Sequence, residues 1–233
     1  MDENIENYIR KIENDKKAKE NNILIENGYL IHENLNASKM RFNSVFKNDR
    51  YGLTNAVFRI LSSMNITNEK IVESNKLYKE IKENINEVTL SNTYVFSKYN
   101  NLNESIIHDI KGYCDTLITI VYLEKKKELV KDVEIGSIGE YIRSSNTDRI
   151  FKENEDFLDV INQLDSSYKH SFSNNMDPSR IGVYDNCIIN YYSKYGKDIF
   201  NPVIISVKLD DIIKGFNEFL DAVENILKEI NGC

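Results

Sequence analysis

The sequence predicts a mainly α-helical bundle with one β-hairpin inserted before the C-terminal helix. Apolar residues recur at three- and four-residue steps through most of the chain after Thr67, which is the pattern of amphipathic helices. Pro178 and Pro202 are the only prolines, so long helices can run without interruption. Residues 183–208 are instead rich in β-branched and aromatic side chains, and this composition favours a hairpin.

The composition fits a globular protein and argues against a general nucleic-acid binder. At 233 residues, with 41% hydrophobic and 29% charged residues, the chain can bury a full core. Its net charge is −7, whereas proteins that hold a nucleic-acid backbone concentrate Lys and Arg on one face. The basic runs, at 16–19 and 125–127, are short and lie among glutamates or asparagines. Nucleic-acid binding would therefore need a local basic groove.

The sequence predicts no leader peptide, membrane span or metal site. The N-terminus, MDENIENYIRK, has no apolar signal region. The most apolar run, CDTLITIVYL at 114–123, is too short to cross a bilayer. Cys114, Cys187 and Cys233 lie far apart and have no histidine close to them, which argues against a disulfide framework and a zinc site. We therefore expect a cytoplasmic protein with no metal and no cofactor.

The first 70 residues are expected to form an N-terminal helical segment that packs on the core. Residues 2–20 carry apolar side chains at helical spacing. Two further helical pieces are expected between residues 37 and 64, with a break near 47–52.

Residues 21–34 fit two different structures. Asn27–Gly28 is a strong hairpin signal, because both residues tolerate positive φ. An apolar stripe also fits a helix, and it consists of Leu24, Gly28, Ile31 and Leu35. We favour the helix slightly because the neighbouring segments are helical, and the hairpin stays open as the alternative.

Residues 71–233 are expected to form the main bundle. Thr67 is predicted to be the N-cap of a helix that runs to about Tyr99, followed by a turn at 98–103. A second long helix then ends in the lysine run at 125–127, which suits a helix C-terminus. The later elements, in chain order, are a short helix at 137–143, a long helix at 148–170 capped by Asp148, strands at 183–193 and 199–208, and a final helix from Asp210.

The helix order, with LDSSYKHS at residues 164–171, resembles the HEPN superfamily (higher eukaryotes and prokaryotes nucleotide-binding) over residues 70–230. The resemblance implies a bundle of four or five helices that is often dimeric. Many members are metal-independent ribonucleases of prokaryotic defence and toxin systems. Their motif is an Arg, a polar residue and a His near the end of a helix, and here Asp165, Ser166 and His170 hold those positions.

Asp165 departs from the family in a way that bears on catalysis. A histidine can transfer protons near neutral pH, and an Arg stabilises the charge that builds on phosphoryl oxygens. An aspartate would instead repel the RNA phosphate. The resemblance therefore implies a bundle that has lost its catalytic pair and acts through protein contacts, within a bacterial or phage defence or counter-defence system.

Two other functions stay open. The first is an RNA endonuclease in which His170 works with Arg180, Asp165 or Tyr168. The second is a bundle that senses a nucleotide or another small ligand in a pocket between its helices. His170 also has a purely structural interpretation, because a histidine near a helix C-terminus interacts favourably with the helix dipole.

A second histidine, His108, precedes Asp109, but neighbouring residues of a helix point to different faces, so their adjacency predicts no His–Asp relay.

We also expect a homodimer with the helix at 148–170 near its two-fold axis, since HEPN-like domains commonly pair there. This helix carries short polar side chains that suit a contact surface better than a solvated face. The expected interface residues are Asn162, Ser166, Tyr168 and Lys169. Two Asp165 carboxylates that approached each other across the axis would repel, unless Lys169 compensated.

Overall fold

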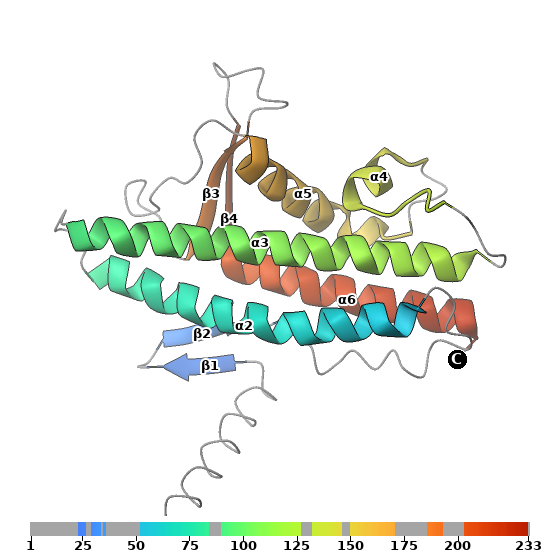
Figure 1. Cartoon of the computed structure of the whole chain (residues 1–233), viewed down its shortest axis with the longest axis horizontal. Helices are drawn as coiled ribbons and strands as arrows, with labels where there is room; N and C mark the ends of the chain where they lie inside the picture. Colours follow the sequence, from blue (N-terminus) through green and yellow to red (C-terminus); the bar gives the residue numbers. More distant parts are fainter. Residues whose placement is uncertain are drawn as a thin grey trace, which may run out of the picture.

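Three long helices run along one another and form the body of the molecule. The computed structural model describes residues 23–26, 29–33, 35, 52–83, 90–126, 132–145, 150–170, 186–192 and 203–232. The long helices are α2 (Leu53–Glu83), α3 (Leu90–Lys125) and α6 (Leu209–Asn231). Figure 1 shows α3 between α2 on one side and the shorter helices on the other.

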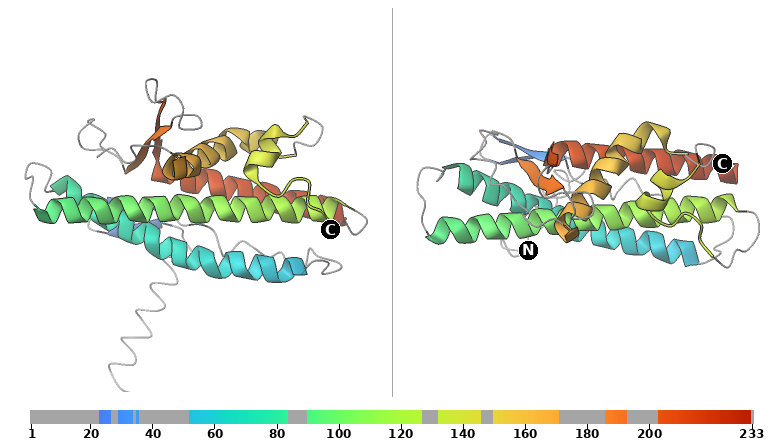
Figure 2. Two further views of the ribbon diagram at one scale, coloured as in Figure 1. Left: turned by 45° about the horizontal axis from the view of Figure 1, so that its top comes forward. Right: turned by 90° about the horizontal axis from the view of Figure 1, so that it is seen from above.

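The shorter helices, α4 (Ile138–Arg143) and α5 (Glu155–His170), pack on α3 away from α2. Both views of Figure 2 agree with this arrangement. A single 3-10 turn, Lys152–Asn154, leads into α5. The short helix expected at 137–143 is confirmed, and the Ser137 side chain caps it by accepting a hydrogen bond from the Glu140 backbone N–H at 3.2 Å.

The hairpin predicted before the final helix is confirmed. Strands β3 (Cys187–Tyr192) and β4 (Val203–Lys208) pair antiparallel, with Cys187 opposite Lys208. Strand β4 continues directly into α6, and the Leu209 backbone N–H donates to the Asn186 carbonyl at 2.9 Å. The fold is therefore the mainly helical bundle with an inserted hairpin that the sequence predicts.

The helix favoured for residues 21–34 is wrong, and the hairpin alternative is right. Strands β1 (Ile23–Glu26) and β2 (Tyr29–Glu33) form a second antiparallel pair, in which Glu26 lies opposite Tyr29. Asn27–Gly28 separates the strands in the sequence, and this dipeptide suits a two-residue hairpin loop. The described residues therefore contain two two-stranded sheets, and the expectation that 183–208 would hold the only substantial sheet is wrong.

The predicted ends of the first two long helices are also wrong. Thr67 lies inside α2 and not at its start, and residues 98–103 lie inside α3 and not in a turn. Contacts between the two helices explain both errors. The buried Thr67 hydroxyl lies 2.8 Å from the Tyr113 hydroxyl, and the Ser74 hydroxyl donates to Asn103 Oδ1 at 2.6 Å. The domain boundary expected at residue 70 falls within α2.

Several other expectations lie outside the described residues. These concern the helix at 2–20, the pieces between 37 and 50, the Asp148 cap and the position of Arg180. The helix expected at 148–170 is α5, and it begins later than expected, at Glu155.

The core lies where α3, α5 and α6 meet, with α2 closing one side. Apolar residues that recur at helical spacing on α3, such as Ile106, Ile110 and Leu117, are fully buried in this core. Aromatic rings pack in the core between the start of α5 and α6, where Phe151 contacts Phe219 edge-on with 5.0 Å between the ring centroids. In the part of the chain that the structure describes, no helix is both long and apolar enough to pass through a lipid bilayer.

Candidate functional site

Asp165 lies at the contact between α5 and α3, with its side chain only 6% exposed. One carboxylate oxygen, Oδ1, is 3.0 Å from Nδ1 of His108 on α3. The other, Oδ2, accepts a hydrogen bond from Lys169 Nζ at 2.7 Å. Both oxygens of this carboxylate are therefore engaged by side chains of the same chain.

Helical spacing explains why these groups meet. Asp165 follows the buried Ile161 by four residues, so it lies on the stripe of α5 that faces α3. Lys169 follows by another four, and an acidic residue four positions before a lysine is the favourable order on a helix. On α3, His108 comes directly after the buried Ile106 and Ile107, at the edge of the packed face.

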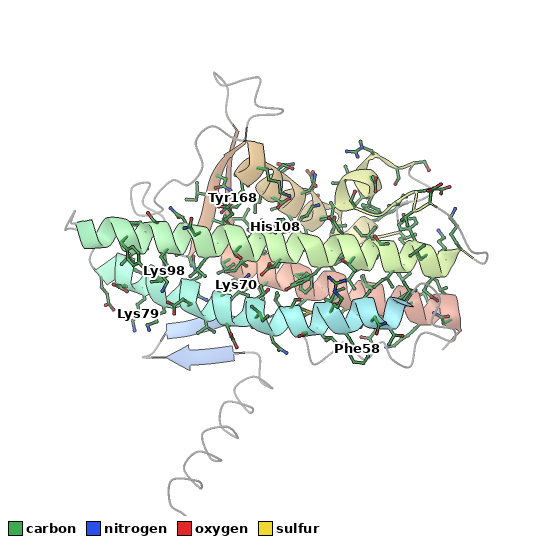
Figure 3. The ribbon with its side chains drawn as sticks, in the orientation of Figure 1. Phe58, Lys70, Lys79, Lys98, His108 and Tyr168 are labelled. Atoms are coloured by element: carbon green, nitrogen blue, oxygen red, sulfur yellow. The ribbon has the colours of Figure 1, made fainter. Side chains whose placement is uncertain are left out.

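The contact fixes the orientation of the imidazole. An ionised carboxylate can only accept hydrogen bonds, so Nδ1 of His108 carries the hydrogen that Asp165 accepts. Nε2 is then left available to other groups, and 64% of the His108 side chain is exposed. A carboxylate that holds one nitrogen of a histidine in this way is the arrangement that positions an imidazole for binding or proton transfer. Figure 3 shows His108 on α3, with Lys70 on the neighbouring α2.

Sequence reasoning missed His108 as the partner of Asp165. The two residues are 57 positions apart, and no local pattern joins them. The expectation that His108 and Asp109 point to different sides is confirmed. Asp109 turns to α2, where its Oδ2 accepts from Lys70 Nζ at 2.6 Å and from the Thr67 hydroxyl at 2.8 Å. The periodicity of α3 was the only available signal, because it placed His108 at the edge of the core stripe.

The other predicted site residues of α5 have different surroundings. Asn162 and Ser166 are half-buried, and Lys169 is exposed apart from its contact with Asp165. Tyr168 packs against the core, and burial raises the pKa of its phenol well above the usual range. The backbone of His170 ends α5, while the side chain of His170 and all of Arg180 lie outside the described residues.

Polar side chains next to Tyr168 hold β3 against α5. The Asn190 amide donates to the Ser167 hydroxyl at 2.8 Å, and that hydroxyl donates to the Leu164 carbonyl at 2.6 Å. Asn190 and Ser167 are both fully buried. These buried hydrogen bonds link β3 to the last turns of α5.

A groove of about 360 Å³ opens between α2 and α3 beside His108. Its described lining combines an arginine, a histidine, a carboxylate, hydroxyl groups and an apolar wall. The residues are Ala56, Arg59, Ile60, Ser63, His108, Asp109, Gly112, Tyr113 and Thr116. Tyr113 is a buried residue of this lining, and burial raises the pKa of its phenol to about 12. The phenol is therefore neutral and serves as a hydrogen-bonding group.

Neither metal chemistry nor a thiol nucleophile finds support in the described residues. Within the described ranges, no three His, Cys, Asp or Glu side chains gather as metal ligands would. Cys114 and Cys187 are both buried there, and burial raises the pKa of the Cys114 thiol far above its usual value. What the described site can do is bind a ligand or move a proton at His108.

No family model, curated protein or solved structure matches this chain.

Proposed function

We propose that this chain is a HEPN-like helical bundle that acts through protein contacts, not by cleaving RNA, within a bacterial or phage defence or counter-defence system. One observation carries the proposal. At the position where the family has its arginine, Asp165 presents a buried carboxylate whose oxygens are held by Lys169 and His108 of the same chain. This position serves the packing of α5 on α3.

The charge at this position supports the same conclusion. Catalysis of phosphodiester cleavage needs positive charge and fixed donors where the phosphoryl oxygens become more negative. An arginine supplies both through its planar fork, whereas the Asp165–Lys169 pair is close to neutral. The amine of Lys169 already donates to the carboxylate, so the pair has little to offer a phosphate.

The proposal includes a homodimer that uses the edge of α5 formed by Asn162 and Ser166. Asn162 and Ser166 lie one helical turn apart on α5 and are half-buried. Asp165 points to α3 of its own chain, so two copies can meet along Asn162 and Ser166 without bringing their Asp165 carboxylates together. Repulsion between the copies is then avoided without help from Lys169.

Incubation of the full chain with total RNA tests the functional proposal. We expect the wild type and His170→Ala to give the same background, since Asp165 stands where the family has its arginine. His32→Ala is the matched control, because it removes another histidine from β2. RNA cleavage by the wild type that is lost in His170→Ala and kept in His32→Ala would overturn the proposal in favour of the endonuclease alternative.

Light scattering at micromolar concentration tests the dimer. We expect about twice the chain mass of 27.2 kDa for the wild type. Ser166→Arg should shift the protein toward the monomer, because it places a long charged side chain at the proposed contact. Asn101→Arg adds the same charge at an exposed position of α3 and should leave the mass unchanged. A wild-type mass of one chain would contradict the dimer.

A further inference from the structure

We infer that the groove between α2 and α3 binds a small phosphate-bearing anion, held by Arg59 and His108. The inference is independent of the proposed protein contacts, and the one feature it shares with the motif at the end of α5 is the contact between Asp165 and His108. It concerns a different surface, which lies on the two helices that meet at Thr67 and Tyr113.

Arg59 is the first reason. Its side chain is exposed on α2, lines the groove, and makes no hydrogen bond or ion pair with any residue that the structure describes. A guanidinium offers paired donors in a planar fork, and this geometry matches two oxygens of a phosphate or carboxylate. An arginine that none of the described residues engages keeps these donors for a ligand.

His108 is the second reason, because its ring is already oriented. Asp165 engages Nδ1 from the α5 side, and no described residue bonds to Nε2, so this nitrogen is the one left for a ligand in the groove. An imidazolium can donate from both nitrogens at once, to Asp165 and to an anion. A side chain that is fixed before binding loses less conformational entropy when the ligand arrives.

The charges around the groove favour an anion over a cation. Asp109 is the one carboxylate in the lining, and it is engaged by Lys70 and by the Thr67 hydroxyl from α2. Among the described residues of the groove, no further carboxylate balances the positive charge of Arg59, although the whole chain carries a net charge of −7. A local excess of positive charge in an acidic protein raises the local concentration of anionic ligands.

The shape of the groove sets the size of the ligand. Its volume of about 360 Å³ lies at the lower end of the usual range for small-molecule sites, so a phosphate joined to a small organic group fits better than a polymer. Ala56 and Ile60 give an apolar wall for the organic part, while the Ser63 and Thr116 hydroxyls lie at the same groove. Phosphate is favoured over carboxylate because three oxygens can engage Arg59 and His108 together.

Gly112 lines the groove without a side chain that would fill it. A Cβ atom built at this position would meet no other heavy atom within 4 Å. Glycine inside a long helix is unfavourable compared with alanine, so this position gives up some helix stability. Any larger side chain at residue 112 would project into the open space beside His108 and would occupy the site.

Titration of the full chain with inorganic phosphate, and separately with phenyl phosphate, tests the inference by ¹H–¹⁵N NMR. Sodium chloride at matched ionic strength is the control for screening. We expect saturable amide shifts near Ser63 and Thr116, and tighter binding of the monoester than of inorganic phosphate. Arg59→Ala and His108→Ala should each weaken binding by roughly tenfold, which is the usual effect of losing one charge-assisted contact.

Two further variants make the test specific. Gly112→Leu should abolish binding while the protein stays folded, because the new side chain enters open space. Lys76→Ala removes a charge from an exposed position 17 residues beyond Arg59 on α2, about 25 Å along the helix, and should leave the affinity unchanged. The inference is overturned if no saturable binding occurs, or if Lys76→Ala weakens it as much as Arg59→Ala. None of these readouts depends on RNA cleavage or on dimer formation.

Discussion

Asp165 and His108 are joined across the α3–α5 contact, with carboxylate Oδ1 3.0 Å from imidazole Nδ1. The carboxylate is almost fully buried and the imidazole is largely exposed, so the pair lies at the boundary between the core and solvent. The same contact engages the Asp165 carboxylate and leaves Nε2 of His108, a residue that lines the groove, for the proposed ligand. The proposals about helix packing, function and ligand binding therefore all use the hydrogen bond between Asp165 and His108.

Gly112→Ala should stabilise the protein by about 0.5–1 kcal/mol. Alanine is the better helix former, and its Cβ at this position would touch nothing within 4 Å. Urea denaturation of the full chain measures the change in the free energy of unfolding. A loss of stability would show that the space beside Gly112 is smaller than the structure has it.

Gly215→Ala should have the opposite effect, although Gly215 also lies inside a long helix. A Cβ at this position of α6 would lie 2.5 Å from a ring carbon of Phe157 on α5, so the Phe157 ring or one of the two helices has to move. We expect a destabilisation of about 1–3 kcal/mol, which is usual for an overpacked core. Gly215→Ala with Phe157→Leu should recover part of the loss. Equal stabilisation by alanine at both glycines would contradict the close approach of α5 and α6.

Tyr99→Phe should destabilise the protein by about 1–3 kcal/mol. The buried Tyr99 hydroxyl donates to Asn186 Oδ1, and the Asn186 amide in turn donates to Asn75 on α2, which links α2 and α3 to the start of β3. Burial raises the pKa of the Tyr99 phenol above its usual range, so it remains a neutral donor. Its loss leaves a buried acceptor without its partner. Tyr94→Phe is the matched control, since Tyr94 is 70% exposed on the same helix, and an equal effect of both changes would refute this network.

Glu140 should stabilise the start of α4 in a pH-dependent way. Hydrogen bonds from the Gly136 N–H and from Ser137 lower the pKa of this carboxyl below its usual value near 4.5. When the pKa is lower in the folded protein, the stabilisation by the Glu140 carboxylate is complete at pH values above its pKa in the unfolded chain. This stabilisation is lost as the pH falls through its pKa in the folded protein. The difference in stability between the wild type and Glu140→Gln should therefore shrink between pH 6 and pH 3, as followed by thermal melts. A difference that stays constant over this window would show that the carboxylate makes no such contacts.

Local patterns in the sequence predict most of the fold, while contacts between distant residues decide the rest. The hairpin at 183–208 and the helix at 137–143 could be predicted because strand composition and glycine punctuation are local. The first two long helices were misplaced because Thr67 and Asn103 have a local preference for caps and turns, and partners on the facing helix satisfy them instead. At residues 21–34, Asn27–Gly28 predicts the hairpin that the structure has. The helical character of the neighbouring segments favours a helix, which is wrong.

The candidate site was harder to predict from the sequence. Asp165 stood out because it replaces an expected arginine, but its partner His108 lies on another helix 57 residues away. Arg59 and Gly112 carry no motif, and they become meaningful only when α2 and α3 lie side by side. The charge and size of a groove depend on which helix faces are apposed, and periodicity alone does not fix this.

The contact between Asp165 and His108 can be measured directly by a double-mutant cycle on the free energy of unfolding. The cycle compares the wild type with Asp165→Asn, His108→Gln and the double variant, at a pH where the protein is most stable. A hydrogen bond to a buried carboxylate from a partly exposed partner predicts a coupling energy of about 1 kcal/mol. Asp165→Asn also changes the surroundings of Lys169, and the cycle cancels this effect because it is present with and without His108. A coupling energy near 1 kcal/mol would support the account, whereas a value within about 0.3 kcal/mol of zero would contradict it, because Asp165 would then be free of the partner that commits it to the α3–α5 contact.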